Sequence, residues 1–426
     1  MDTILRLALR NALRNARRST LTAVTVLLGC ALLTIGLAWV LGIQGNFIDA
    51  SVRANGHVRL VSDAYDKRER IQPLYENLPQ TDALIERLSQ VEGVRTVYPR
   101  IQVGVLASVG NEIGEVYGQI IGAPLPYFET ILDLKPRVID GTWFSAEPDN
   151  EALIGQALAN TMGVVAGDEA IFIGQTQDGS PSPIKVTVVG VVDTGNGLFD
   201  KQVFVPLEKA RWLTDIPEGA IELLLFGDNP PDARHIMARL TPQLDEIARD
   251  AGLTDIEGQP AGFAMSSWNT REPFASLLLF ARIIMGAIAA IIVFITALGV
   301  LNTMLMSVLE RTAEIGVLRA MGMKVHAVVL MFVLEALAIS SIGGLLGAIL
   351  GSGVALLMER YGVDLGSTAS DLPDTIPANS TLYPDWSPEI ALVAFGLGLV
   401  MAFIGSASPA LRAARIQPVT AMRARR

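Results

Sequence analysis

The chain has 426 residues, of which 50% are hydrophobic and only 18% are charged; its formal net charge is −10 and its mean hydropathy is +0.41. Soluble globular proteins carry about 25% charged residues, so this composition excludes an ordinary soluble enzyme and indicates an α-helical membrane protein. The acidic balance gives no electrostatic footprint for nucleic-acid binding. The single cysteine, Cys30, excludes an intrachain disulfide.

Residues 1–19 predict a basic amphipathic helix that lies in the membrane interface, with leucines on one side and arginines on the other. The apolar run at 20–43 is long enough for a first transmembrane helix, which takes about 20 residues. A basic start before an apolar run is also typical of a signal peptide. The run is longer than the usual ~7–15 residues and no small-x-small cleavage site follows it, so we expect a retained helix.

Residues 44–275 have ordinary polar composition and predict a mixed α/β domain. "HVRLVS" (57–62) and "VRTVYPRIQVGVLASV" (94–109) are rich in β-forming residues, whereas "TDALIERLSQV" (81–91) has helical spacing. We expect two subdomains with a boundary near 125–150. The segment contains no catalytic motif.

Three further apolar runs, at 276–308, 325–358 and 388–408, predict transmembrane helices two to four. A helix over 276–308 would be roughly 50 Å long against a hydrocarbon core of about 30 Å, so we expect it to project beyond the bilayer. The remaining segments are a short connector, a loop and a tail, at 309–324, 359–387 and 409–426. The predicted fold class is an α-helical membrane protein with four transmembrane helices and a large mixed α/β domain between the first two.

The distribution of charge predicts the orientation of the chain. Arginines crowd residues 1–19 and 409–426, whereas residues 44–275 contain 18 Lys and Arg against 33 Asp and Glu. Short cytoplasmic flanks of membrane helices are enriched in Lys and Arg. We therefore expect both termini and the connector 309–324 in the cytoplasm, and the α/β domain on the outside.

The connector 309–324 predicts a short helix. Glu314 in its first turn and Arg319 in its last turn both suit the helix dipole, and Gly322 is placed for a left-handed C-cap. Ile315, Leu318 and Met321 form an apolar stripe along it. Two interpretations stay open on physical grounds: the helix caps its own hairpin, or it fills a groove in a cytoplasmic partner.

Few residues of the apolar runs offer chemistry. Glu335 and Arg282 are isolated charges that we expect on opposite faces; Glu335 is either a functional membrane acid or a residue near the cytoplasmic surface. Gly343, Gly347 and Gly351 form two overlapping Gly-x-x-x-Gly steps, which predict close helix packing.

Catalytic motifs are absent from the sequence. The dipeptide Gly-Lys does not occur, so the chain has no phosphate-binding P-loop and we expect it to bind no ATP, metal or other cofactor itself. It also lacks the metalloprotease and serine-hydrolase motifs. A multispan protein of this kind is a conduit, a sensor or a lever.

The segment "LERTAEIGVLRAMGMKVHAVVLMFVLEALAISSIGGLLGAILG" (309–351) resembles the signature of the MacB/FtsX/lipoprotein-releasing superfamily of ABC transporter permeases. "LALRNALRNARRSTLTAVTVLLGCALL" (7–33), "LIGQALANTMGVVAGDEAIF" (153–172) and "PALRAARIQPVTAMR" (409–423) are similar to parts of the lipoprotein-releasing (Lol-type) branch. The resemblance covers nearly the whole chain. It implies that the connector is the coupling helix that docks into a separate ATPase, which would bind ATP and Mg²⁺. The implied coupling residues are Glu310, Arg311, Glu314, Ile315, Gly316, Leu318, Arg319 and Gly322.

The resemblance also implies a multi-pass protein of the bacterial inner membrane, paired with an ATPase dimer and with a second permease copy or paralogue. The implied activity is extraction of lipoproteins, with acyl chains held near Leu37, Leu41, Ile43 and Phe47, where glycines 36, 42 and 45 would leave grooves. The connection "GQTQDGSPSPIK" (174–185) is shorter than the basic, Pro-rich hook that binds the periplasmic carrier in one Lol-type subunit. Two alternatives are a MacB-like efflux permease with a periplasmic adaptor and an FtsX-like regulator of a cell-wall hydrolase.

Overall fold

The computed structural model describes residues 16–79, 81–109, 112–194, 199–229, 232–250, 262–270, 274–364 and 381–415. Most of the amphipathic helix expected at 1–19, and the tail beyond 415, lie outside the described residues. The described chain forms two compact units. The membrane unit contains the residues up to Gly45, Leu279–Asp364 and those from Thr381 onward, and the α/β unit contains Asn46–Leu278.

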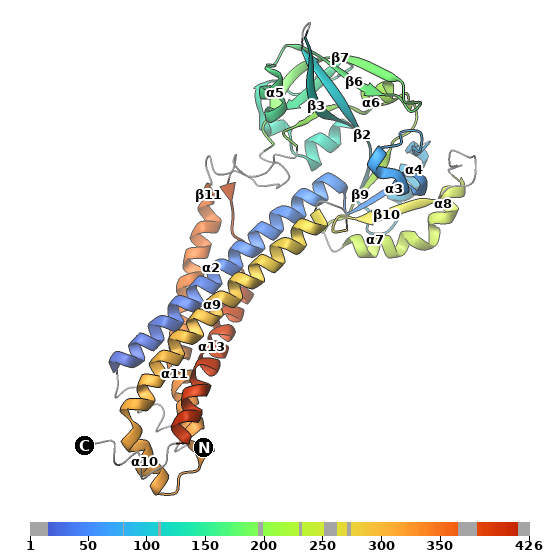
Figure 1. The fold of residues 1–426 in the computed structure, drawn as a ribbon. Helices are drawn as coiled ribbons and strands as arrows, with labels where there is room; N and C mark the ends of the chain where they lie inside the picture. Colours follow the sequence, from blue (N-terminus) through green and yellow to red (C-terminus); the bar gives the residue numbers. More distant parts are fainter. Residues whose placement is uncertain are drawn as a thin grey trace. The chain divides into compact units, whose positions relative to one another are not determined.

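Four long helices make up the membrane unit: α2 (Ala16–Asn55), α9 (Phe274–Glu310), α11 (Val325–Tyr361) and α13 (Pro388–Ala414). Each contains a stretch that is long and apolar enough to cross a membrane. They run alongside one another, and the short helix α10 (Thr312–Ala320) connects α9 to α11 at one end of the bundle (Figure 1). A two-residue pairing of β11 (Val363–Asp364) with β12 (Thr381–Leu382) completes this unit.

All four helices extend beyond the predicted spans, α9 by two residues at each end. Helix α2 continues from the expected end at 43 to Asn55, so its last ten residues belong to the α/β unit. Helix α11 continues to Tyr361, and α13 continues through Pro409 to Ala414. Pro409 removes one hydrogen-bond donor, but the "ALRAA" segment that follows consists of strong helix formers. The hydrophobic runs therefore locate the membrane spans correctly but underestimate the lengths of the helices.

A stripe of glycines brings α11 against α2. A Cβ atom added to Gly343, Gly347 or Gly351 would lie 2.4, 2.3 or 2.8 Å from the carbonyl oxygens of Ala23, Leu27 and Ala31, respectively. These carbonyls follow one another at intervals of four residues, so the two helices are in backbone contact over at least three turns. Only glycine permits this approach.

The α/β unit contains a ten-stranded sheet with the strand order β10-β1-β9-β2-β3-β8-β5-β7-β4, in which β6 pairs with both β2 and β7. The strands are β1 (Val58–Ser62), β2 (Thr96–Val109), β3 (Glu112–Ala123), β4 (Val138–Gly141), β5 (Glu151–Gly155), β6 (Glu169–Gln175), β7 (Pro181–Val192), β8 (Gln202–Pro206), β9 (Glu222–Phe226) and β10 (Phe263–Ser267).

Two lobes share this sheet, and the long strand β2 runs through both (Figure 1). The first lobe packs α4 (Thr81–Ser89), α7 (Asp232–Leu240) and α8 (Leu244–Asp250) on β10, β1, β9 and the start of β2. The second lobe packs α5 (Gln156–Met162) and α6 (Leu207–Thr214) on the other strands.

The expected subdomain boundary near 125–150 is wrong, because that segment lies inside the second lobe. The lobes divide within β2, whose residues 96–100 pair with β9 and whose residues 101–109 pair with β3 and β6. Phe128 and Phe144, in the segment expected to contain the boundary, are buried in an aromatic cluster. A π-helical turn at Tyr127–Ile131 and a 3-10 turn at Lys135–Arg137 shape this segment.

Replacing Gly347 with alanine tests the backbone contact between α2 and α11. The new methyl group would overlap the Leu27 carbonyl oxygen, and overpacking of this kind costs about 1–3 kcal/mol. Gly353→Ala is the matched control, since Gly353 lies on the same helix with no atom within 4 Å of an added Cβ. We expect Gly347→Ala to lower the Tm of the purified chain and Gly353→Ala to leave it unchanged; equal shifts would contradict the packing.

Candidate functional site

Helix α10 is a short helix with a defined end. It begins after Arg311, whose backbone (φ −104°, ψ 13°) separates it from α9. At its other end Gly322 adopts a φ of +93°. The Gly322 N–H donates to the Arg319 carbonyl at 3.1 Å and the Met323 N–H donates to the Leu318 carbonyl at 3.0 Å. These two bonds form a Schellman motif, which stops the helix where Gly322 predicts.

A buried ion pair anchors α10 to α11. The Arg311 Nη1 lies 3.2 Å from the Glu335 Oε2, and the Arg311 Nε lies 3.0 Å from the Glu314 Oε2. The guanidinium also lies over the ring of Phe332, with 5.8 Å between Cζ and the ring centroid. Arg311 and Glu335 are both buried, whereas Arg282 is exposed on α9. The isolated acid of the third span is therefore paired with the residue that precedes α10.

The apolar stripe expected on α10 is divided between two faces. Ile315 is only 1% exposed and packs in the cluster formed by the ends of α9, α11 and α13, and Gly316 is also buried. Leu318 is half-buried, whereas Val317 is 48% and Met321 is 75% exposed. The face left open to a partner therefore contains Val317 and Met321 rather than Ile315. Glu310 and Glu314 are exposed beside it.

The C-terminus of α2, which lies within the α/β unit, is a second site where a helix end is held by buried polar side chains. The Arg53 carbonyl accepts a hydrogen bond from the Tyr127 hydroxyl at 2.8 Å, and the Ala54 carbonyl accepts one from the Arg100 Nη1 at 2.5 Å. The Arg100 guanidinium also donates to the Tyr127 hydroxyl oxygen at 3.2 Å. Carbonyls at a helix C-terminus lack intrahelical partners and carry partial negative charge. A cation and a hydroxyl of the sheet domain satisfy them here.

Two further contacts fix this helix end. Gly56, with a φ of +68°, ends the helix in the left-handed region, and its N–H donates to the Val52 carbonyl at 2.7 Å. The Ser51 Oγ donates to the Trp268 carbonyl at 2.7 Å, one residue beyond β10. The end of α2 is thus hydrogen-bonded to β2, the π-helical turn and the segment that leads to α9.

A buried charge network holds Arg100 in position. The Arg100 Nε lies 2.6 Å from the Glu222 Oε1, and the Arg59 Nε contacts the other carboxylate oxygen of Glu222. The Arg59 Nη2 lies 3.1 Å from the Glu69 Oε1. The side chains of Arg59, Arg100 and Glu222 are each at most 3% exposed. Removing one member of such a network leaves an uncompensated buried charge, which costs about 3–5 kcal/mol.

Both arginines of this network stay charged. Burial by itself would lower the pKa of Arg100, but the Glu222 carboxylate outweighs burial and the pKa lies above its ordinary value. For Arg59, burial is likewise outweighed by Glu222 and Glu69, and its pKa is also raised. Burial raises the pKa of Tyr127, and the Arg100 charge only partly offsets it. Tyr127 therefore stays a neutral hydrogen-bond donor.

The residues expected to contact acyl chains do not form one exposed surface. Phe47 is 8% exposed and belongs to the α/β unit, whereas Leu37 is half-buried against the cluster of Ala38, Ala355 and Ile390 in the membrane unit. Leu41 is 38% exposed and Ile43 is half-buried. Of the three glycines, Gly42 leaves no open groove, because the backbone of Tyr383 and Pro384 occupies the space beside it. An added Cβ at Gly36 or Gly45 would have no atom within 4 Å.

Sequence reasoning missed Arg59, Arg100 and Glu222. Each is a lone charge inside an otherwise apolar strand segment, in "HVRLVS", "TVYPR" and "IELLLF". Lone charges of opposite sign in neighbouring buried strands indicate a buried network, because strands rarely bury charge without a partner. The signal was present, but the pairing of β1 and β2 with β9 was needed to connect the three residues. Within the described part of the chain, no group of three or more His, Cys, Asp or Glu could hold a metal ion.

The fold defines a class: a membrane protein with four long apolar helices and a large α/β domain inserted after the first of them. Residues 19–251, more than half of the chain, match the family described as MacB-like periplasmic core domain, and residues 286–418 match the family described as FtsX-like permease C-terminal. The chain belongs to the MacB/FtsX-type family of ABC transporter permeases. A specific similarity to Lol-type permeases is not shown.

Curated relatives agree with the family. The chain is 27% identical over 329 residues to the pyoverdine export ATP-binding/permease protein PvdT of Pseudomonas syringae pv. syringae, covering 74% of this chain and 45% of the relative. It is 28% identical over 299 residues to the macrolide export ATP-binding/permease protein MacB of Pasteurella multocida, covering 68% and 40%. The chain thus spans less than half of the length of each relative.

One solved structure similar to this chain is the periplasmic region of MacB from Actinobacillus actinomycetemcomitans. The identity is 14%, the TM-score is 0.35, and the match covers 51% of this chain and 92% of that structure.

Substitutions at the Arg311–Glu335 pair test the anchor of α10. We expect Arg311→Met and Glu335→Leu to destabilise the chain by up to about 3–5 kcal/mol each, because each removes one partner of a buried ion pair. The double variant should recover much of that loss, since no lone charge remains. Thermal unfolding of the purified chain measures this, with the exposed Arg360→Met as the control. Strictly additive losses in the double variant would mean that the two residues do not interact.

Proposed function

We propose that the chain is a mechanical permease, in which nucleotide-driven movement at α10 is transmitted along the membrane helices to the α/β unit. The observation that carries the proposal is the buried capping of α2 by Arg100 and Tyr127. A helix that crosses a membrane and ends in a buried hydrogen-bonded network transmits force, because its end cannot move without the strands that hold it.

The first step of the transmission is from α10 to α11. Arg311 and Ile315 are buried, and both lie against the ends of the long helices. A push on the exposed Val317 and Met321 would therefore move α10 together with α11 and leave the Arg311–Glu335 pair intact. Packed interiors shift between discrete arrangements and do not deform continuously.

The second step is from α11 to α2. The contacts of Gly343, Gly347 and Gly351 with the α2 backbone leave no side-chain layer to absorb movement between the two helices. Helix α2 is continuous from Ala16 to Asn55 and has no proline. It therefore carries displacement from the membrane unit directly into the residues that Arg100 and Tyr127 hold.

The partners follow from the family. The chain has no P-loop, and its relatives are named as ATP-binding/permease proteins. We propose that an ATP-binding domain outside this sequence, as a dimer, docks on the face of α10 that contains Val317 and Met321. A second permease copy or paralogue would pair with the membrane unit, where α9 presents a long exposed apolar face that includes Phe280, Ile291 and Phe294.

We also propose that the membrane is the bacterial inner membrane, with the termini and α10 in the cytoplasm and the α/β unit outside. The supporting observation is charge: arginines crowd both ends of the chain and the α/β segment is acidic.

Export is the cargo assignment that we favour. The relatives are named for macrolide and pyoverdine export, and a mechanical permease that works with a periplasmic adaptor needs no acyl-binding groove of its own. Lipoprotein extraction is the second candidate, because Leu41 is exposed and Gly36 and Gly45 leave open positions on α2.

A charge on the exposed face of α10 tests the docking of the ATP-binding domain. Val317→Asp and Met321→Asp should each abolish coupled ATPase activity in the reconstituted complex, because a desolvated carboxylate in an apolar groove costs several kcal/mol. Val317→Thr, which keeps the shape without the charge, should retain most of the activity. Full activity in both aspartate variants would show that α10 only caps its own hairpin.

A photocrosslinker at Leu41 separates the two cargo assignments. For an exporter it should capture phospholipid in all nucleotide states, because Leu41 then faces lipid. Capture of a triacylated lipoprotein without nucleotide, followed by release with ATP, would replace export with extraction. Mass spectrometry of the crosslinked product distinguishes the two results.

A further inference from the structure

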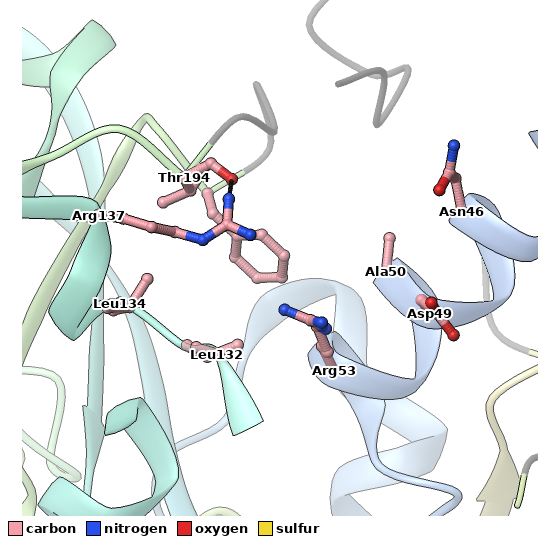
Figure 2. A pocket seen from close by; sticks show the side chains of 9 residues that line it. Asn46, Asp49, Ala50, Arg53, Leu132, Leu134, Arg137 and Thr194 are labelled. Atoms are coloured by element: carbon pink, nitrogen blue, oxygen red, sulfur yellow. Dashed lines mark hydrogen bonds between the residues drawn. The ribbon is translucent and has the colours of Figure 1, made fainter. Parts of the chain in front are cut away.

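A cavity of about 190 Å³ lies beside the last turns of α2, entirely within the α/β unit. Asn46, Asp49 and Arg53 line one side of it at spacings of three and four residues, which place them on one helix face. Arg137 faces them from the 3-10 turn before β4 (Figure 2). None of these four side chains belongs to the network that caps α2; only the backbone carbonyl of Arg53 takes part in it.

Two buried hydrogen-bond donor atoms of the cavity lining have no partner. The Arg137 Nη1 donates to the Thr194 carbonyl at 2.5 Å, but its Nε is buried with no partner. The Asn46 Nδ2 is likewise buried with no partner, and the Arg53 guanidinium forms no ion pair with any described residue. Figure 2 shows Arg53 and Arg137 extending into the space between them, whereas the Asp49 carboxylate, at the edge of the lining, is turned away from the two guanidinium groups. Buried donors are almost always paired, so this set calls for an acceptor.

Thr194 and Asp200 hold the Arg137 side chain in position. The Asp200 carboxylate accepts hydrogen bonds from the Thr194 N–H at 2.8 Å and from the Thr194 hydroxyl at 2.6 Å, which orients the Thr194 carbonyl toward Arg137. Burial raises the pKa of Asp200, while the bonds from Thr194 and the charge of Arg137 oppose that rise. Asp200 is occupied by Thr194 and therefore leaves the other nitrogens of Arg137 available.

We infer that this cavity binds a phosphate-type oxyanion carried on a lipid headgroup. Guanidinium groups bind phosphate through paired, charge-assisted hydrogen bonds, and two of them enter this cavity. Leu132, Leu134, Ala50 and Phe199 supply an apolar wall for the carbon atoms attached to the phosphate. The cavity is smaller than the ~300–1,000 Å³ typical of drug-sized ligands, so it suits a headgroup rather than a whole cargo molecule.

The place of the cavity along α2 favours a lipid as the source of the phosphate. Asn46 lies three residues, about 4.5 Å, beyond Ile43, the last residue of the apolar run. The Asn46 end of the cavity therefore falls within the headgroup layer, which adds about 5–8 Å to each side of the hydrocarbon core, whereas the Arg53 backbone lies about 15 Å beyond Ile43. Side chains on a helix tilt toward its N-terminus, so the Arg53 guanidinium reaches back toward the membrane end of α2.

Thermal shift of the full chain in detergent tests the site. The probes are dioleoyl phosphatidylglycerol, dioleoylglycerol, which has the same chains without phosphate, and soluble glycerol phosphate. We expect a saturable rise in Tm with phosphatidylglycerol and none with dioleoylglycerol. In the variant Arg53→Gln/Arg137→Gln the apparent affinity for phosphatidylglycerol should fall about tenfold or more, since each charge-assisted bond is strong. The variant Arg234→Gln/Arg249→Gln, which removes two exposed charges of the same unit, should bind as the wild type does.

The possible outcomes test two claims separately: that the cavity binds phosphate, and that the phosphate belongs to a lipid. Weak or absent binding of soluble glycerol phosphate supports a lipid headgroup. Equal binding of glycerol phosphate and phosphatidylglycerol would overturn the lipid assignment, even if both depend on Arg53 and Arg137. An equal loss in both double variants, or no loss in either, would overturn the site itself. The unliganded Tm of each variant shows whether it is folded, and none of these results depends on ATPase activity or on transport.

Discussion

A single buried cation, Arg100, holds the end of the first membrane helix to the sheet of the α/β unit. It donates to the Ala54 carbonyl while Glu222 neutralises its charge, so the helix end, β2 and β9 are one hydrogen-bonded assembly. Strand β2 then continues through both lobes of the sheet. Without this contact the Ala54 carbonyl at the end of α2 would lose its partner, and the helix end would keep only its bonds to Tyr127 and Trp268.

The same design occurs at the other end of the helix system. Arg311 is buried, carries a positive charge at the start of α10 and is neutralised by an acid, Glu335, on a neighbouring helix. In both places a short junction is held by an arginine that makes several bonds at once. Buried ion pairs contribute little net stability but strongly penalise any arrangement that separates them. That property agrees with the proposed mechanism, in which each junction moves without breaking its ion pairs.

Much of this architecture could be predicted from the sequence. The four spans, the short α10 and its end at Gly322 follow from local patterns, since apolar length and helix caps depend on nearby residues. The full length of α2 and the subdomain boundary could not be predicted. The boundary depends on strand pairing between residues more than a hundred positions apart, such as Arg100 and Glu222. The last turns of α2 lie beyond its apolar run, so hydrophobic length alone did not include them. The orientation of Ile315 was also missed, because an apolar stripe does not reveal whether its partner is the chain's own helices or another protein.

The central claim is that movement reaches the α/β unit through the capped end of α2. It is tested most directly by the distance between spin labels on Asp178→Cys, in the α/β unit, and Tyr361→Cys, at the end of α11, in a chain with Cys30→Ala. Both positions are exposed. The complex with its ATPase should show one distance distribution without nucleotide and another when trapped with ATP and vanadate. Arg100→Gln should remove that change while the chain stays folded and hydrolyses ATP. An unaltered change in the Arg100→Gln complex would contradict the account.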